Sequence, residues 1–352
     1  MLGEVEMDVI KKFHIDILPI ETPALFFGIK RENYKPWRLF DGTPVLVPGD
    51  LNIEIDEEGN WLLHEGGDSK KPIVAKMPKD GYYFDDLGLI KSSNEPPRLS
   101  LNGLRKKYLL TGEEIEFMRK RASFLRKETD KALITGFWLK SGLGIIGSML
   151  DFLTLIALDK RYIKEFLYKK QEVIMKNLRL LWEALDKNID IVTLEGFDFG
   201  AQNGELFSPV GFEELYLSHY KKQFAWIHEN TTWKTFQHCC GSITKILPLL
   251  VDAGLDIINP VQTSSYGMSP KWLKEQFGDK ITFWGGGVDT QKTFPFGTPE
   301  DVSKEVEERI KIFAPGGGFV FCPIHNIQYG VPVDNIIAGF ETAYNCGQYC
   351  IT

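Results

Sequence analysis

Two residues that could hold a metal ion stand together in the motif His238-Cys239-Cys240-Gly241. His238 and Cys240 are two apart, so at the end of a β-strand their side chains would point to one side while Cys239 points to the other. Gly241 would allow a sharp turn into the next element. Imidazole and thiolate on one side suit Zn²⁺. Because buried His and Cys are also common core residues, the pair alone is weak evidence for a metal.

Cys322 is a candidate third ligand, because it directly follows another predicted strand, residues 318–321. A third protein ligand would leave one coordination position open, as catalytic zinc sites require. Cys322 could instead be a small core residue that finishes the strand. The other candidates for the third ligand are His325 and the carboxylates of Asp198 and Glu195. The residues by themselves do not choose between these four.

Further polar side chains follow the predicted strands, where a barrel of parallel strands places the residues that face its substrate. The candidate catalytic residues are Asp198, Asp289 and His325, which could transfer protons or orient a substrate. The candidate substrate-binding residues are Glu195, Gln202, Gln262 and Gln328. Three glycines, residues 285–287, precede Asp289 and would let the backbone approach a ligand closely. Asp289 could equally be a turn-forming residue, and Asp198 could also form a turn, although a functional role is slightly favoured for Asp198.

Strands and helices alternate in the second half of the chain. Short apolar and β-branched runs predict strands at 189–194, 232–237, 256–259, 281–284 and 318–321. The predicted helices that follow them are at about 209–230, 242–253, 268–277, 298–313 and 333–348. This alternation indicates a parallel sheet. None of these five predicted strands is linked to its helix by a Gly-x-Gly-x-x-Gly turn, which favours a barrel over an open doubly wound sheet.

The first 110 residues are expected to form an N-terminal segment and a lobe packed on a barrel of residues 111–352, in a single structural unit. Within them, residues 51–55 and 61–63 flank a turn at 56–60, which predicts a β-hairpin. Thr111 with Glu114 is a helix-start signal, and residues 160–186 have helical spacing. A length of 352 residues with 43% hydrophobic content allows one large core.

Composition excludes several classes of partner. The formal net charge is −7, and Lys and Arg are scattered along the sequence, so it shows no basic cluster that would bind the phosphates of nucleic acid. No segment approaches the roughly 20 apolar residues of a membrane span, and residues 1–6 lack the features of a signal peptide. The five cysteines are an odd number confined to the last third of the chain, which does not fit a secreted disulfide framework. We therefore expect a cytoplasmic protein without a membrane partner.

The ordered motifs of the chain resemble those of the uroporphyrinogen decarboxylase superfamily, and of its methyltransferase-like branch, from about Val5 onward. The resemblance rests on Phe13-His14-Ile15-Asp16, Asp198-Phe199-Gly200-Ala201-Gln202 with Ser208-Pro209, His238-Cys239-Cys240-Gly241, the run from Asp256 to Gln262, Gly286-Gly287-Val288-Asp289-Thr290-Gln291 and the run from His325 to Ile336. It implies an α/β fold, a distorted (β/α)8 TIM-type barrel with an N-terminal lobe that contains a β-hairpin.

The resemblance also implies a chemistry. In corrinoid-dependent methyltransferases of this superfamily, such as methylcobamide:coenzyme M methyltransferases, a His-x-Cys pair and a later Cys bind zinc, which matches His238, Cys240 and Cys322. The implied cofactors are Zn²⁺ and a corrinoid (methylcobamide) supplied by a partner corrinoid protein, since the chain has no Asp-x-His-x-x-Gly segment of its own. The implied substrate is a small methyl donor or acceptor, a thiol or a methyl ether or amine. A homodimer is also expected, because proteins with barrel folds often form dimers.

Two other functions fit the same residues. A metal-free decarboxylase or lyase would use Asp198, Asp289 and His325 around a carboxylated ring. A non-catalytic protein would carry a tetrapyrrole or corrinoid. Porphyrin decarboxylation itself is not expected, because the chain lacks the Arg-rich N-terminal stretch of true uroporphyrinogen decarboxylases and has Pro23 near the position of their pyrrole-binding Asp.

Overall fold

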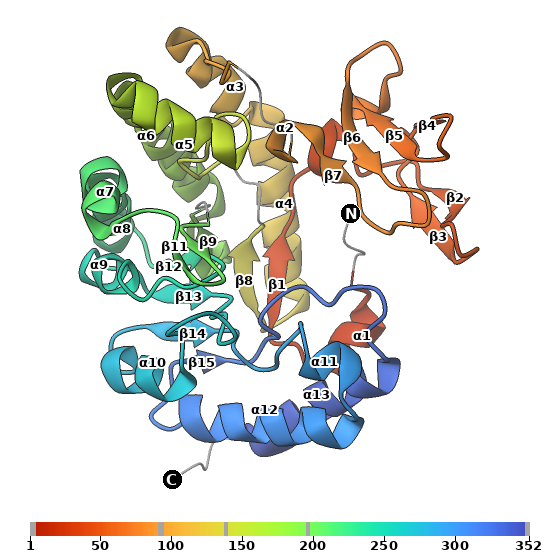
Figure 1. Ribbon diagram of the computed structural model, residues 1–352, viewed down its shortest axis with the longest axis vertical. Coiled ribbons are helices and arrows are strands. Elements are labelled where there is room, and N and C mark those ends of the chain that lie inside the picture. Colours follow the sequence, from red (N-terminus) through yellow and green to blue (C-terminus); the bar gives the residue numbers. More distant parts are fainter. Residues whose placement is uncertain (1–4, 91–94, 137–139, 195–197, 349–352) are drawn as a thin grey trace.

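A parallel sheet forms the centre of the computed structural model, which describes residues 5–90, 95–136, 140–194 and 198–348 (Figure 1). The strand order is β1-β8-β9-β12-β13-β14-β15, and every adjacent pair is parallel. The strands are β1 (Ile17–Ile20), β8 (Ala132–Thr135), β9 (Ile191–Thr193), β12 (Lys234–His238), β13 (Ile257–Asn259), β14 (Thr282–Trp284) and β15 (Phe319–Val320). The five strands predicted from apolar runs are therefore confirmed as β9 and β12 to β15.

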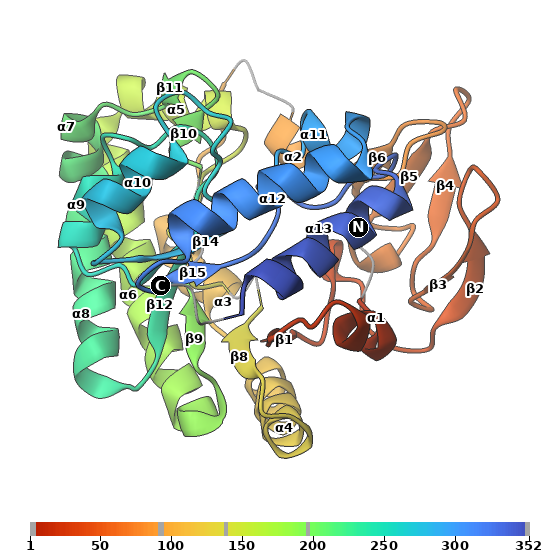
Figure 2. The ribbon, with the colours of Figure 1, turned by 90° about the horizontal axis from the view of Figure 1, so that it is seen from below.

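Helices cover the sheet on its outer side (Figures 1 and 2). The longer ones are α4 (Gly112–Glu128), α5 (Met149–Leu158), α6 (Lys160–Leu185), α8 (Ser218–Asn230), α10 (Pro270–Phe277), α12 (Pro299–Phe313) and α13 (Val333–Cys346). The shorter ones are α1 (Met7–Lys12), α2 (Leu87–Ile90), α3 (Leu104–Tyr108), α7 (Pro209–Phe212), α9 (Leu247–Asp252) and α11 (Thr293–Phe296), and Glu213–Leu217 is a π-helical turn between α7 and α8. Among the described helices, none is long and apolar enough to cross a bilayer.

The predicted start signal at Thr111 is a complete capping box. The Thr111 hydroxyl accepts from the Glu114 N–H, and the Glu114 carboxylate accepts from the Thr111 N–H. The same arrangement between Thr298 and Asp301 begins α12. The helix predicted for 242–253 is shorter as α9, because the backbone N–H groups of Ser242 and Lys245 bind Ala201 and Glu205 before the helix begins.

The sheet is a curled half-barrel, which is consistent with the distorted TIM-type barrel that the resemblance implied, and it has seven strands among the described residues. In the part of the chain that is described, β1 and β15 are its two edges. After β15 the chain runs through the loop 321–332 into α13, which lies beside α12 (Figure 2). Phe13 stacks on Phe340 with 4.8 Å between ring centroids, and His14 stacks on Tyr344 at 3.6 Å. A helix, and no described strand, therefore connects this side of the molecule to the N-terminal segment.

The N-terminal lobe consists of antiparallel strands, drawn in orange beside the sheet in Figure 1. They are β2 (Lys35–Arg38) with β3 (Pro44–Val47), and the four-stranded sheet β4 (Ile53–Ile55), β5 (Trp61–His64), β6 (Ile73–Met77) and β7 (Asp85–Asp86). The predicted hairpin is confirmed as β4 and β5. The Asp56 carboxylate holds its turn by accepting from the N–H groups of Glu58 and Asn60.

A small apolar layer on one face of the parallel sheet locates the predicted site. Ile134, Ile191, Phe236 and Ile257 form this layer, each from a different strand, and Trp284 packs against it. Side chains alternate along a strand, so Phe236 and His238 point to the same face. His238 therefore lies at the C-terminal end of the strands, directly beyond this layer.

Candidate metal centre

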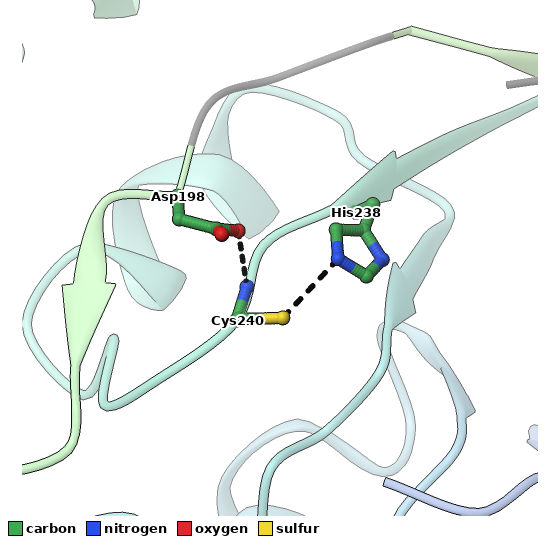
Figure 3. Close-up of side chains that lie close together, drawn as sticks. All are labelled: Asp198, His238 and Cys240. Carbon is green, nitrogen blue, oxygen red and sulfur yellow. Dashed lines mark hydrogen bonds between the residues drawn. The ribbon is translucent and has the colours of Figure 1, made fainter. Parts of the chain in front are cut away.

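Asp198, His238 and Cys240 converge at the C-terminal end of β12 (Figure 3). One potential ligand atom from each residue lies within 4.8 Å of the others. The Cys240 Sγ is 3.2 Å from the His238 Nε2, and the Asp198 Oδ1 accepts a 2.7 Å hydrogen bond from the Cys240 N–H. His238 ends β12, Cys240 follows in the next turn, and Asp198 stands two residues before β10 (Gly200–Ala201). Two distant motifs of the sequence thus form one group.

Close backbone packing brings the two motifs together. Gly241 has a φ of +83°, and a Cβ at this position would collide with the backbone of Gly200. The Ser242 N–H donates to the Ala201 carbonyl at 2.9 Å, which continues the contact along the chain. The glycine pair therefore explains how the segment that carries Asp198 comes to lie on the turn that carries Cys240.

Two predicted substrate-binding residues stabilise this turn. The Gln262 Oε1 accepts from the Gly241 N–H at 2.8 Å, and the Gln262 Nε2 donates to the Gln202 Oε1 at 3.0 Å. The Gln202 Nε2 in turn donates to the Ser264 carbonyl at 2.7 Å. The structure thus brings Gln202 and Gln262 to the site, where their amides bind each other and the backbone.

Asn259 is a site residue to which the sequence analysis gave no role. It ends β13 directly opposite His238 in the parallel register, and its Oδ1 lies 2.6 Å from the His238 Nδ1. The available signal was its position as the last residue of a predicted apolar strand, beside the strand that ends in His238. Side chains that lie opposite each other on neighbouring strands can interact, so a polar residue at one strand end can bind a polar residue at the next.

The two neighbouring cysteines have different surroundings. Burial raises the pKa of the Cys240 thiol to about 12, and the negative charge of Asp198 and a hydrogen bond to it act in the same direction. Cys239 is 2% exposed and lies among apolar side chains that include Ile243 and Leu247. Its sulfur accepts from the Phe199 N–H at 3.2 Å, and burial also raises its pKa. Cys239 therefore points away from the group, as the alternation of side chains predicts.

Cys322 lies outside the group formed by Asp198, His238 and Cys240. Burial raises the pKa of its thiol to about 12, and a side-chain hydrogen bond with Trp284 partly offsets this effect. The Trp284 ring packs edge-on against Phe236, 5.0 Å between centroids. The Cys322 side chain is thus hydrogen-bonded to Trp284, which packs against the small apolar layer of the sheet. Cys322 lies two residues after the end of β15, close to where it was predicted.

The other predicted residues do not belong to the group formed by Asp198, His238 and Cys240. The Asp289 carboxylate accepts from the Gln291 N–H at 2.7 Å, the contact of a turn-forming Asp. His325 and Gln328 are exposed in the loop after β15. Glu195 lies outside the described residues. In the described part of the chain, no hydrogen bond connects Asp289 or His325 to Asp198.

The glycines before Asp289 accommodate the protein's own backbone. A Cβ at Gly285 would collide with the Pro260 carbonyl, and the Gly287 N–H donates to the Cys322 carbonyl at 2.9 Å. The close approach that these glycines permit is therefore made by the loops that follow β13 and β15.

One protein-family model matches most of the chain. The model of the family described as uroporphyrinogen decarboxylase (URO-D) matches residues 100–346, more than half of the chain. The chain belongs to the uroporphyrinogen decarboxylase family. The matched span includes every residue of the site described above.

Two further comparisons give context for this uroporphyrinogen decarboxylase family member. No curated protein matches the chain. One similar solved structure is a methyltransferase from Methanosarcina mazei, with a TM-score of 0.51 and 17% sequence identity, over 72% of this chain and 71% of that one. At this identity the similarity concerns the fold.

The donor set of this family member fits a zinc ion. An imidazole nitrogen, a thiol sulfur and a carboxylate oxygen are all zinc ligands in proteins. With bonds of roughly 2.0–2.3 Å, the donors of a tetrahedral zinc lie roughly 3.3–3.8 Å apart. The observed separations, from 3.2 Å up to at most 4.8 Å, require only small side-chain shifts to reach this arrangement.

Proposed function

We propose that this uroporphyrinogen decarboxylase family member is a zinc-dependent methyltransferase, which exchanges a methyl group between a small substrate and the corrinoid of a separate protein. The observation that carries the proposal is the group of Asp198, His238 and Cys240 at the C-terminal strand ends. The similarity in fold to a protein named a methyltransferase supports it. The substrate would be a thiol, or a methyl ether or amine.

The first two proposed zinc ligands are His238 Nε2 and Cys240 Sγ, which lie 3.2 Å apart. Asp198 is the third ligand that the geometry favours, and Cys322 is the third ligand that the resemblance implied. A bound Zn²⁺ would polarise the substrate heteroatom as a Lewis acid, and would lower the pKa of a thiol substrate.

The protein's own residues prepare the site for this role. A cysteine binds a metal as the thiolate, and burial raises the pKa of the Cys240 thiol, so metal binding at Cys240 would release a proton. Asp198 and Gln262 hold the Cys240–Gly241 turn through two backbone N–H groups. This support fixes the direction of the Cys240 side chain before any ligand arrives.

Electrons and protons balance in either direction of transfer. A thiol acceptor would supply the electron pair of the new bond to the methyl carbon and lose its proton to solvent, and the electrons of the broken carbon–cobalt bond would stay with the partner's corrinoid. A methyl ether or amine donor would keep the electrons of its broken bond and take up a proton, and the pair for the new bond would come from the partner's corrinoid.

Metal analysis combined with a transfer assay tests the proposal. The purified protein is expected to contain zinc and to transfer the methyl group of methylcobalamin to a thiol, or a donor's methyl group to cob(I)alamin. Chelation should remove the activity and added Zn²⁺ should restore it. Full methyl transfer by metal-free protein would exclude the role of zinc.

The metal-free decarboxylase or lyase is the second candidate, because the matching family is named for a decarboxylase. It would rely on Asp198, Asp289 and His325, and it predicts that Cys240→Ser leaves the activity nearly unchanged. The proposed methyltransferase predicts loss of activity in the same variant, so one substitution separates the two functions.

A further inference from the structure

Asn259 connects the candidate metal ligand His238 to the backbone of a third strand. It is 7% exposed at the end of β13, between the ends of β12 and β14 in the sheet. One end of its amide lies 2.6 Å from the His238 Nδ1, and the other lies 2.9 Å from the Trp284 carbonyl oxygen. Three neighbouring strand ends are therefore joined by a single side chain.

The Trp284 carbonyl determines which way this amide points. A backbone carbonyl can only accept a hydrogen bond, so the amide group that faces it must be the NH₂ of Asn259. The Asn259 oxygen then faces His238, and this oxygen can only accept. The imidazole nitrogen opposite it, Nδ1, must therefore carry the hydrogen.

The position of this hydrogen fixes the properties of the other imidazole nitrogen. In a neutral ring with Nδ1–H, the Nε2 has a lone pair and no hydrogen. Nε2 is the atom that lies 3.2 Å from the Cys240 sulfur, within the group that includes Asp198. The opposite tautomer would direct an N–H into this group and could not bind a metal through Nε2.

We infer that Asn259 is a positioning residue, which selects the Nδ1–H tautomer of His238 and so presents the Nε2 lone pair to the metal site. The tautomer is a property of the metal-free chain. Its consequence for metal binding rests on the proposed function. Outer partners of this kind orient ligating histidines in many metal sites, and their loss typically costs roughly 10- to 100-fold in metal affinity.

The tautomer can be measured directly. In metal-free, ¹⁵N-histidine-labelled protein at mildly alkaline pH, where imidazoles are neutral, long-range ¹H–¹⁵N correlation spectra distinguish Nδ1–H from Nε2–H. The spectrum of His238→Gln identifies the His238 signals. We expect the Nδ1–H form in the wild type. The Nε2–H form in the wild type would overturn the inference without any reference to metal.

Two substitutions at Asn259 separate tautomer selection from simple loss of packing. Asn259→Leu has a similar size but removes the acceptor, so a shift toward Nε2–H is expected, with zinc affinity roughly 10- to 100-fold lower in a chelator competition titration. Asn259→Asp keeps an acceptor for His238 and should retain the Nδ1–H form, although it cannot donate to Trp284. If Asn259→Leu kept the wild-type tautomer, or its zinc affinity, the inference would be wrong.

The outcomes also separate this inference from the proposed function. A wild-type protein with Nδ1–H at His238 that loses this form in Asn259→Leu supports tautomer selection even if the protein binds no zinc, in which case the proposed function fails alone. Asn259→Asp is the folding control, since it preserves the size of the side chain and should rescue the tautomer that Asn259→Leu loses.

Discussion

Asp198 contacts the turn that carries Cys240 and belongs to the same group of possible ligand atoms as His238, whereas Cys322 is hydrogen-bonded to Trp284. If the proposed zinc is bound, this geometry favours Asp198 over Cys322 as its third ligand. We expect Asp198→Asn to weaken zinc binding by more than the roughly 10- to 100-fold that is typical of an outer-shell change. Cys322→Ala should have a smaller effect.

The two variants form a matched comparison, measured by competition with a chromophoric chelator. Asn at position 198 can still accept from the Cys240 N–H, so the turn should persist and the effect should report the lost carboxylate. A larger loss of zinc affinity in Cys322→Ala than in Asp198→Asn would instead assign the third ligand to Cys322, as the resemblance implied.

Spacing in the sequence was enough to predict His238 and Cys240, because residues two apart at a strand end share a side. It could not choose Asp198 as their neighbour. That choice depends on the packing of Gly200 against Gly241, a contact between segments about 40 residues apart that no local pattern encodes. The roles of Gln202 and Gln262 were hidden for the same reason, since their partners lie on other loops.

At the scale of the elements, β12 and β13 are joined at both ends. The site occupies their C-terminal ends, and Asp256 ties their N-terminal ends by accepting from the N–H and the hydroxyl of Thr235 and by contacting His228 at 2.8 Å. Polar residues at this end of parallel strands typically serve stability, and those at the opposite end typically serve function.

Asp256 should make stability depend on acid pH. Burial alone would raise the pKa of Asp256, but hydrogen bonds from His228 and Thr235 outweigh burial and lower it. A pKa that is lower in the folded state stabilises the protein above the unfolded pKa of about 3.9, and this contribution disappears as the pH falls through the folded value. Asp256→Asn should therefore cost about 1–3 kcal/mol near neutral pH.

Urea unfolding at a series of pH values measures this effect. Below about pH 4 the wild type should lose stability more steeply than Asp256→Asn, because the variant has no carboxylate to protonate. If the free energy of unfolding fell equally with pH in both proteins over this acid range, the lowered pKa of Asp256 would be contradicted.

Apolar runs predicted the five later strands because each is a buried segment between turn signals. The strands β1 and β8 were not predicted. β1 lies within the first 110 residues, expected to form an N-terminal segment and lobe, but it pairs with β8 across more than 100 residues of sequence. Such a long-range pairing leaves no periodic signal in either segment.

At the scale of the whole molecule, the N-terminal lobe contacts the loop that follows β15. The ring of Tyr82 stacks on Tyr329 with 3.6 Å between centroids, and the Tyr83 hydroxyl accepts from the Tyr329 N–H at 3.0 Å. The same loop carries His325 and Gln328. The lobe therefore helps to position the loop that carries these two predicted residues, a contact that no local sequence pattern indicates.

Tyr329→Ala should loosen this loop with little effect on the rest of the fold. An aromatic pair contributes about 0.5–1.5 kcal/mol beyond its buried area, so hydrogen exchange of the backbone in residues 323–332 should become several-fold faster. Tyr168→Ala, another exposed tyrosine on α6, is the control. Unchanged exchange in the loop of Tyr329→Ala would show that the lobe does not hold it.

Zinc binding by Cys239→Ala and Cys240→Ala separates the proposed metal ligand, Cys240, from the buried thiol of Cys239. Both proteins would be loaded with Zn²⁺, and their zinc content and affinity compared with the wild type. If Cys240 binds the metal and Cys239 does not, we expect about one zinc per chain in the wild type and in Cys239→Ala, and loss of zinc from Cys240→Ala with its secondary structure intact. A wild type without zinc, or a Cys240→Ala variant with wild-type affinity, would contradict the proposed role of Cys240.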